Sequence, residues 1–162
     1  MRGAVEGVST GQGRLWIQRS TKQEYQECTH ACLSHSEAFE AALKSLSVHE
    51  LPAFTAIAHR VVHGGDQFDR PQFIDPQVLG ILRSQVRFAP LHMPPQIATI
   101  EIAQYRFPGL PHVACFDTAF HHTVPQVEQM LALPYDAWER GLRRYGFHGL
   151  SYEYQSLVLE RR

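Results

Sequence analysis

Short hydrophobic runs recur along the chain, and their spacing alternates between that of a strand and that of a helix. Leu15 and Ile17 occupy every second position of a segment that predicts an outer strand over residues 14–19. Glycine interrupts the residues before that segment, at positions 3, 7, 11 and 13. No element is therefore predicted before residue 14.

The polar segment from Thr21 to Glu27 has two interpretations. Thr21 and Glu24 have the spacing of a capping box, which would open a helix at this point. We favour a loop here, followed by a helix from about Thr29 to Leu46. Its apolar residues fall at helical spacing, at Cys32, Phe39, Leu43 and Leu46.

The middle of the chain alternates strand and helix patterns. An apolar run at residues 54–58 predicts a buried strand that continues to residue 62. Asp75 before Pro76 is typical of a helix start, because a capping carboxylate precedes proline at the first helical position. The buried face of that helix is expected at Val78, Leu79 and Leu82.

Residues 88–92 predict a short extended piece, followed by a helix over 95–105 on Ile97 and Ile100. The apolar run 113–116 is typical of a strand buried on both faces. A proline-marked segment leads on to a final helix, capped by Ser151 and running to Leu159.

Strands that alternate with helices predict an α/β domain. The last predicted helix ends on Glu160-Arg161-Arg162, without the glycine or proline that often closes a domain, so we expect an incomplete end. The 162 residues are 44% hydrophobic and 19% charged, as expected of a soluble globular protein. Their net charge of −1 gives no electrostatic case for nucleic acid or an anionic membrane as a partner.

Neither a signal peptide nor an apolar run of the ~20 residues that a bilayer requires is recognisable. The three cysteines follow no disulfide pattern, which favours a reducing cytoplasm. They are Cys28, Cys32 and Cys115.

Four polar side chains each follow an apolar run: Arg60, His92, Asp117 and His148. Ligands gather at strand ends in α/β folds, so this recurrence predicts one shared pocket. A guanidinium at a strand end offers forked donors for a carboxylate or a phosphate. Each residue also has a structural interpretation: a surface ion pair for Arg60, a buried histidine bonded to backbone for His92, and a simple turn at Asp117-Thr118.

The ten histidines of the chain raise the possibility of a zinc site. His59 and His63 flank a strand, on which four residues span roughly 13 Å, too far for one metal ion. Cys32 lies on the apolar stripe of its predicted helix, and His121 and His122 would diverge. We therefore expect no metal site. The two glycine-rich motifs match no nucleotide-binding fingerprint; they are Gly64-Gly65 and Gly146-Phe147-His148-Gly149.

Four motifs together resemble the acetate kinase (acetokinase) family, in that family's order and approximate spacing. They are His59-Arg60-Val61-Val62-His63-Gly64-Gly65, Ala89-Pro90-Leu91-His92, Phe116-Asp117-Thr118-Ala119-Phe120-His121 and Arg143-Arg144-Tyr145-Gly146-Phe147-His148-Gly149.

The resemblance implies the ribonuclease-H-like fold of the acetate and sugar kinase/Hsc70/actin superfamily. It also implies transfer of a phosphoryl group from ATP, with Mg²⁺, to acetate, giving acetyl phosphate and ADP in a cytoplasmic homodimer. By resemblance, residues 1–162 form a partial N-terminal domain, incomplete at both ends. The nucleotide-binding half and most ligands of Mg²⁺–ATP are then expected outside this chain, which alone is expected to be inactive.

The resemblance also implies roles for individual residues. Arg60 would hold the carboxylate or phosphoryl oxygens, and His148 would donate to the transferring phosphoryl group. Asp117 would organise the magnesium and its waters, or orient the arginine. The acyl pocket would be bounded by Val62, Leu91 and Phe147, with His92 as a polar wall.

The chain departs from the family pattern at Met93, where asparagine is usual, and at Leu150 and Tyr152, where threonine and histidine are usual. These changes alter local hydrogen bonding and leave Arg60, Asp117 and His148 in place. Three alternatives stay open: a truncated, non-catalytic remnant with an anion site, a propionate kinase, and, last, a metal-binding histidine protein.

Overall fold

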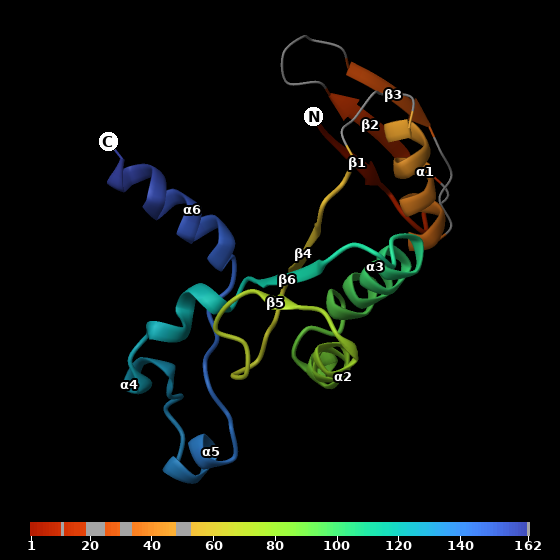
Figure 1. Ribbon diagram of the computed structural model, residues 1–162. Helices are drawn as coiled ribbons and strands as arrows, with labels where there is room; N and C mark the ends of the chain where they lie inside the picture. The colour runs from red at the N-terminus through yellow and green to blue at the C-terminus, as the bar shows by residue number, and fades with distance from the viewer. Residues whose placement is uncertain (11, 19–24, 30–33, 48–52, 162) are drawn as a thin grey trace. The chain divides into compact units, whose positions relative to one another are not determined.

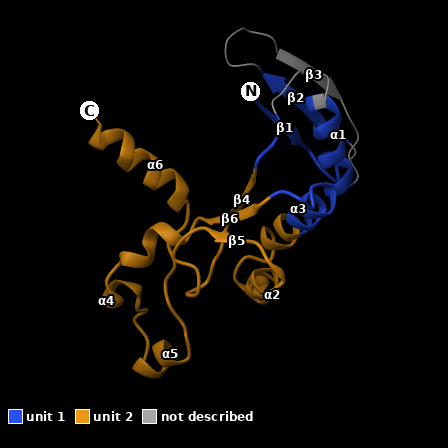
Figure 2. Cartoon of the chain, in the orientation of Figure 1, with its two compact units in different colours: residues 1–55, 98–110 blue, residues 56–97, 111–162 orange. Residues whose placement is uncertain are grey.

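The chain folds into two compact units, each of which is described by itself (Figure 2). Unit 1 comprises residues 1–55 and 98–110, and unit 2 comprises residues 56–97 and 111–162. The computed structural model describes residues 1–10, 12–18, 25–29, 34–47 and 53–161.

Unit 1 contains a three-stranded antiparallel sheet with the order β1-β2-β3 (Figure 1). Leu15 and Ile17 of β2 are buried, and the helix α1 contacts both β1 and β2. The elements are β1 (Arg2–Glu6), β2 (Arg14–Gln18), β3 (Tyr25–Thr29) and α1 (His35–Ser47).

The strand predicted over 14–19 is confirmed as β2, but its place at the edge of a sheet is wrong, because β1 and β3 pair with its two sides. β1 was not expected, and the predicted loop is wrong for residues 25–27, which belong to β3. Pairing with β2 supplies backbone hydrogen bonds along both neighbours. These bonds outweigh the weak strand propensity of glycine-rich and polar segments.

The helix α1 begins at His35, so its predicted start at Thr29 is wrong. A capping box at Ser34 and Glu37 explains the later start. The Glu37 amide donates to Ser34 Oγ at 3.2 Å, and the Ser34 amide donates to Glu37 Oε2 at 3.2 Å. The alternative box at Thr21 and Glu24, and the stripe residue Cys32, lie outside the described residues.

Unit 2 contains a mixed sheet with the order β4-β6-β5, in which β4 is parallel and β5 antiparallel to the central β6. The strand predicted at 113–116 is confirmed as β6, but its burial on both faces is wrong, because Val113 and Cys115 are only partly buried. The strand β4 starts at Ile57, three residues later than the predicted start at residue 54, and residues 53–56 are exposed. The strands are β4 (Ile57–Val61), β5 (Gln72–Phe73) and β6 (His112–Phe116).

The helix α2 (Pro76–Ser84) confirms its prediction in detail. Asp75 caps it by accepting a hydrogen bond from the Val78 amide at 2.7 Å. Its buried side chains are the expected ones, at Val78, Leu79 and Leu82. The cap, the proline and the apolar face of α2 all lie within ten residues, so the local sequence pattern was sufficient to predict this helix.

The remaining helices differ more from the prediction. Residues 89–92 form a turn between two helices instead of an extended piece, and Ser151 lies inside the last helix, whose N-cap is His148. Hydrogen bonds from the backbone amides of His92 and Met93 to the Ala89 carbonyl close that turn.

The remaining helices of the chain are η1 (Gln85–Phe88), α3 (Met93–Arg106), η2 (Ala119–Thr123), α4 (Gln126–Gln129), α5 (Tyr135–Glu139) and α6 (Gly149–Glu160). Every helix among the described residues is too short or too polar to span a bilayer.

A histidine pair links the two parallel strands of unit 2 and gives a testable pH dependence. His59 Nε2 lies 3.0 Å from His112 Nδ1, and the two rings stack with centroids 5.4 Å apart. Burial, and then the nearness of His112, lower the pKa of His59 from 6.5 to about 4. The folded state therefore keeps His59 neutral at pH values where the unfolded chain binds a proton.

The free energy of unfolding should consequently fall as the pH drops from about 6.5 towards about 4. Allowing for partial exposure, we expect His59 to contribute a loss on the order of 1–2 kcal/mol between about pH 7.5 and pH 5. Urea melts at the two pH values measure it. His59→Asn should remove this part of the slope. Equal slopes in wild type and His59→Asn would contradict the prediction.

Candidate active site

The candidate site lies where β4 and β6 end, because the parallel pairing of these strands brings their carboxyl ends together. Arg60 is paired in register with Cys115, two residues before Asp117. The Asp117 amide donates to the Val61 carbonyl at 2.9 Å, which extends the pairing past the last residue of β6. Two side chains 57 positions apart in sequence thus meet at one edge of the sheet.

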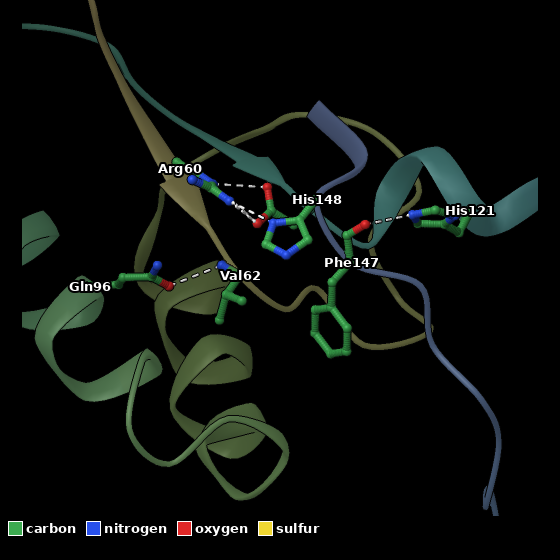
Figure 3. A network of polar contacts seen from close by, with 7 residues as sticks. Arg60, Val62, Gln96, His121, Phe147 and His148 are labelled. Carbon is green, nitrogen blue, oxygen red and sulfur yellow. Dashed lines mark hydrogen bonds and ion pairs between the residues drawn. The ribbon is translucent and has the colours of Figure 1, made fainter. Parts of the chain in front are cut away.

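Arg60 and Asp117 form a forked ion pair (Figure 3). Arg60 Nε donates to Asp117 Oδ1 at 3.0 Å and to Oδ2 at 3.1 Å, and Nη2 donates to Oδ2 at 2.7 Å. The Asp117 side chain is 1% exposed, whereas that of Arg60 is 57% exposed. The hydrogen bond with Asp117 raises the pKa of Arg60 above its ordinary value, with burial opposing it. Asp117 therefore fixes a permanently charged guanidinium whose outer side faces solvent.

His148 joins this pair from the start of α6 (Figure 3). Arg60 Nη2 lies 3.4 Å from His148 Nδ1, and the guanidinium is the donor in this contact because it has no acceptor atom. A neutral imidazole that accepts at Nδ1 carries its proton on Nε2. His148 can therefore donate from Nε2 to a group bound beside Arg60, while the two Nη1 hydrogens of Arg60 have no partner among the described residues.

Three of the four polar residues expected to share a pocket are therefore brought together, at Arg60, Asp117 and His148. His92 lies in the turn before α3, is exposed, and has no polar side-chain contact with them in the described chain. The interpretation of His92 as a buried histidine is wrong. The interpretation of Arg60 as a surface ion pair holds for its own exposed side chain, but the partner carboxylate of Asp117 is buried.

The apolar residues expected around the substrate differ in exposure. The Val62 amide donates to Gln96 Oε1 at 3.0 Å, which ties the strand end to α3. Phe147 is 37% exposed, and its side chain and that of Val62 project to the same side in Figure 3. Leu91 is 84% exposed, in the same turn as His92.

A buried histidine that sequence reasoning considered only as a zinc ligand supports this edge of the sheet. His63 is 1% exposed and stacks on Phe88, with ring centroids 4.8 Å apart. Burial lowers its pKa, so the ring is neutral and its Nδ1 accepts from the Gly65 amide at 2.8 Å. The Gly64 amide donates to Thr118 Oγ1 at 3.0 Å. The paired glycines are thus held to both strand ends.

The described residues do not form a magnesium site. Both carboxylate oxygens of Asp117 are engaged by Arg60, and the side chain is buried. No group of three or more histidine, cysteine, aspartate or glutamate side chains in the described chain is placed to hold a metal ion. Of the two roles considered for Asp117, this geometry supports orientation of the arginine.

Solved structures of similar fold are carboxylate kinases. A propionate kinase from Francisella tularensis matches with a TM-score of 0.85 and 33% identity, over 95% of this chain and 40% of that one. An acetate kinase from Porphyromonas gingivalis matches with a TM-score of 0.83 and 32% identity, over 93% and 39%. The α/β fold is therefore that of the acetate and sugar kinase/Hsc70/actin superfamily, as expected.

Sequence comparison is more specific. The chain is 42% identical over 157 residues to an acetate kinase from Deinococcus radiodurans, covering 95% of this chain and 39% of the relative. It is 54% identical over 100 residues to one from Rhodopseudomonas palustris, covering 62% and 25%. A model of the acetokinase family matches residues 1–161, and the chain belongs to that family. It spans at most about two fifths of the length of these relatives.

Proposed function

We propose that this chain forms the carboxylate-binding part of an acetate kinase-type phosphotransferase, which converts ATP and acetate into ADP and acetyl phosphate. The observation that supports this most is the forked Arg60–Asp117 pair, because it holds a cation at a strand end with unused donors facing outward. A cytoplasmic homodimer remains a prediction from the family resemblance.

The roles proposed for the residues follow from charge. Acetate is ionised at neutral pH, so its oxygen can attack the terminal phosphorus of ATP without a strong base, and the bond from that phosphorus to the leaving ADP oxygen breaks. Arg60 would bind the carboxylate and phosphoryl oxygens, and Asp117 would keep the guanidinium in place. His148 would donate from Nε2 as charge shifts on the phosphoryl oxygens.

A chimera with a related enzyme tests this function. Residues 1–161 would replace the matching part of the Deinococcus radiodurans acetate kinase, whose sequence aligns over nearly the whole chain. Acetate-dependent acyl phosphate, measured as the hydroxamate, is the expected result. A folded chimera that binds acetate without turnover would favour the non-catalytic alternative, with an anion site only.

The side chains proposed to bound the methyl group of acetate are Val62, Phe147 and Leu91, with His92 as a polar wall. The similarity to a propionate kinase structure makes propionate the second candidate substrate. A pocket discriminates against one methylene by only about 1–3 kcal/mol. The preference for either acid should therefore be modest.

In the chimera we expect a higher kcat/KM for acetate than for propionate, with Val62→Ala moving the preference towards propionate by roughly 10-fold. Removing both γ carbons of Val62, one of the side chains proposed to bound the methyl group, would leave space for one more carbon. Val113→Ala, a matched change on β6, should leave the ratio unchanged. A higher kcat/KM for propionate in the unmodified chimera would refute the acetate assignment.

A further inference from the structure

We propose that His121 is a positioning residue that holds His148 in the conformation in which its ring meets Arg60. This inference deepens the proposed function, since it concerns the placement of His148, the residue proposed to donate a hydrogen bond to the transferring phosphoryl group. It rests on hydrogen bonds in unit 2, and its main test does not depend on turnover.

The backbone of His148 is in the left-handed region, with φ 57° and ψ 24°. This conformation costs a residue with a side chain roughly 1–2 kcal/mol, and it persists only where the surroundings impose it. The rotations φ and ψ relate the peptide plane before the Cα atom to the plane after it. Fixing both planes therefore fixes the residue.

Both planes are held here by one short segment after β6. The Phe147 carbonyl, in the plane before His148, accepts from His121 Nε2 at 2.9 Å (Figure 3). The Gly149 amide, in the plane after it, donates to the Asp117 carbonyl at 2.8 Å. The residue that orients Arg60 and the residue proposed to orient His148 thus lie four positions apart.

The surroundings of His121 set the direction of its ring. Phe120 and Tyr152 contact it edge-on, with centroids 5.4 and 5.8 Å away. The absence of a side chain at Gly146 makes space for the His121 ring, because a Cβ atom at position 146 would overlap that ring. Tyr152 is one of the positions at which the chain departs from the family pattern.

The neighbouring histidine provides a matched comparison. His122 Nδ1 lies 2.7 Å from the Ala119 carbonyl, to which it donates within its own helical turn. It makes no described bond with residues 147–149. A merely structural effect of losing an imidazole from η2 should therefore be similar for both residues, whereas the effect on His148 should belong to His121 alone.

Nuclear magnetic resonance on the full chain tests the proposal with three variants: His121→Ala, His121→Gln and His122→Ala. In His121→Ala we expect shifted His148 ring signals and amide exchange at Gly149 that is faster by at least about 10-fold, because one of the two peptide planes is released. Glutamine can place a donor near the position of Nε2, so His121→Gln should retain most of the protection. His122→Ala should resemble wild type.

Amide exchange at Leu82, which lies inside α2 with a fully buried side chain, reports global stability. If His121→Ala lowers protection there as well, Gly146→Ala replaces it as the test, since that change displaces the ring without removing it. Unchanged Gly149 exchange and unchanged His148 signals in these variants would overturn the proposal.

In the chimera, His121→Ala should lower kcat with little change in KM. A chimera without any turnover would count against the proposed function and would leave the resonance test intact.

Discussion

Replacing Arg60 with alanine in the acetate kinase chimera is expected to lower kcat by at least about 10²–10³-fold, with a smaller rise in KM for acetate. The interaction of Arg60 with the phosphoryl oxygens strengthens as charge develops, so its loss weighs more on the transition state than on bound acetate. Arg60→Lys should rescue only in part, because an ammonium cannot form the fork that Arg60 makes with Asp117. Hydroxamate kinetics on purified variants measure both effects.

Arg70 provides the matched control. It is an exposed arginine whose guanidinium pairs with its neighbour Asp69, Nε to Oδ1, at 2.9 Å. Arg70→Ala should keep kcat within about twofold of wild type, because this exposed pair makes no described hydrogen bond with Arg60, Asp117 or His148. Thermal melts beside the kinetics separate loss of rate from loss of fold. Near-normal kcat in a well-folded Arg60→Ala chimera would end the catalytic interpretation of Arg60.

The second large effect is expected at Gly149. A Cβ atom there would overlap the Asp117 carbonyl, which is backbone and cannot move aside cheaply. Gly149→Ala should therefore break the bond between the Gly149 amide and that carbonyl, and move His148 away from Arg60. We expect a loss of stability of about 2–3 kcal/mol, in the range of overpacked sites. In the chimera, kcat should fall by at least about 10²-fold, in the range expected for loss of one preorganised donor.

Gly80→Ala is the control for this prediction. Gly80 lies inside α2, and a Cβ atom there would meet nothing within 4 Å. Alanine at an exposed helical position should stabilise the chain by roughly 0.5–1 kcal/mol. Denaturant melts of the two variants should thus move in opposite directions. A stable Gly149→Ala chain with unchanged His148 resonances would contradict the prediction.

The elements that sequence predicted well are those whose causes lie close together in the chain. The helix α2 has its cap at Asp75, its proline and its buried face within ten residues. The strand β6 contains one continuous apolar run, residues 113–116, which Asp117 follows directly. The strands β1 and β3 were not predicted, because pairing with β2, and not their own composition, makes them strands.

The candidate site divides in the same way. Sequence by itself determined which side chains end the apolar runs, and so it identified Arg60, Asp117 and His148 and the family to which the chain belongs. Only the tertiary structure decided that Asp117 is buried beneath Arg60, that His92 is exposed without a described hydrogen bond to them, and that His121 reaches Phe147. Spacing in a sequence specifies faces and ends of elements. Which ends meet depends on the parallel pairing of β4 with β6 and on backbone bonds between residues far apart in the chain.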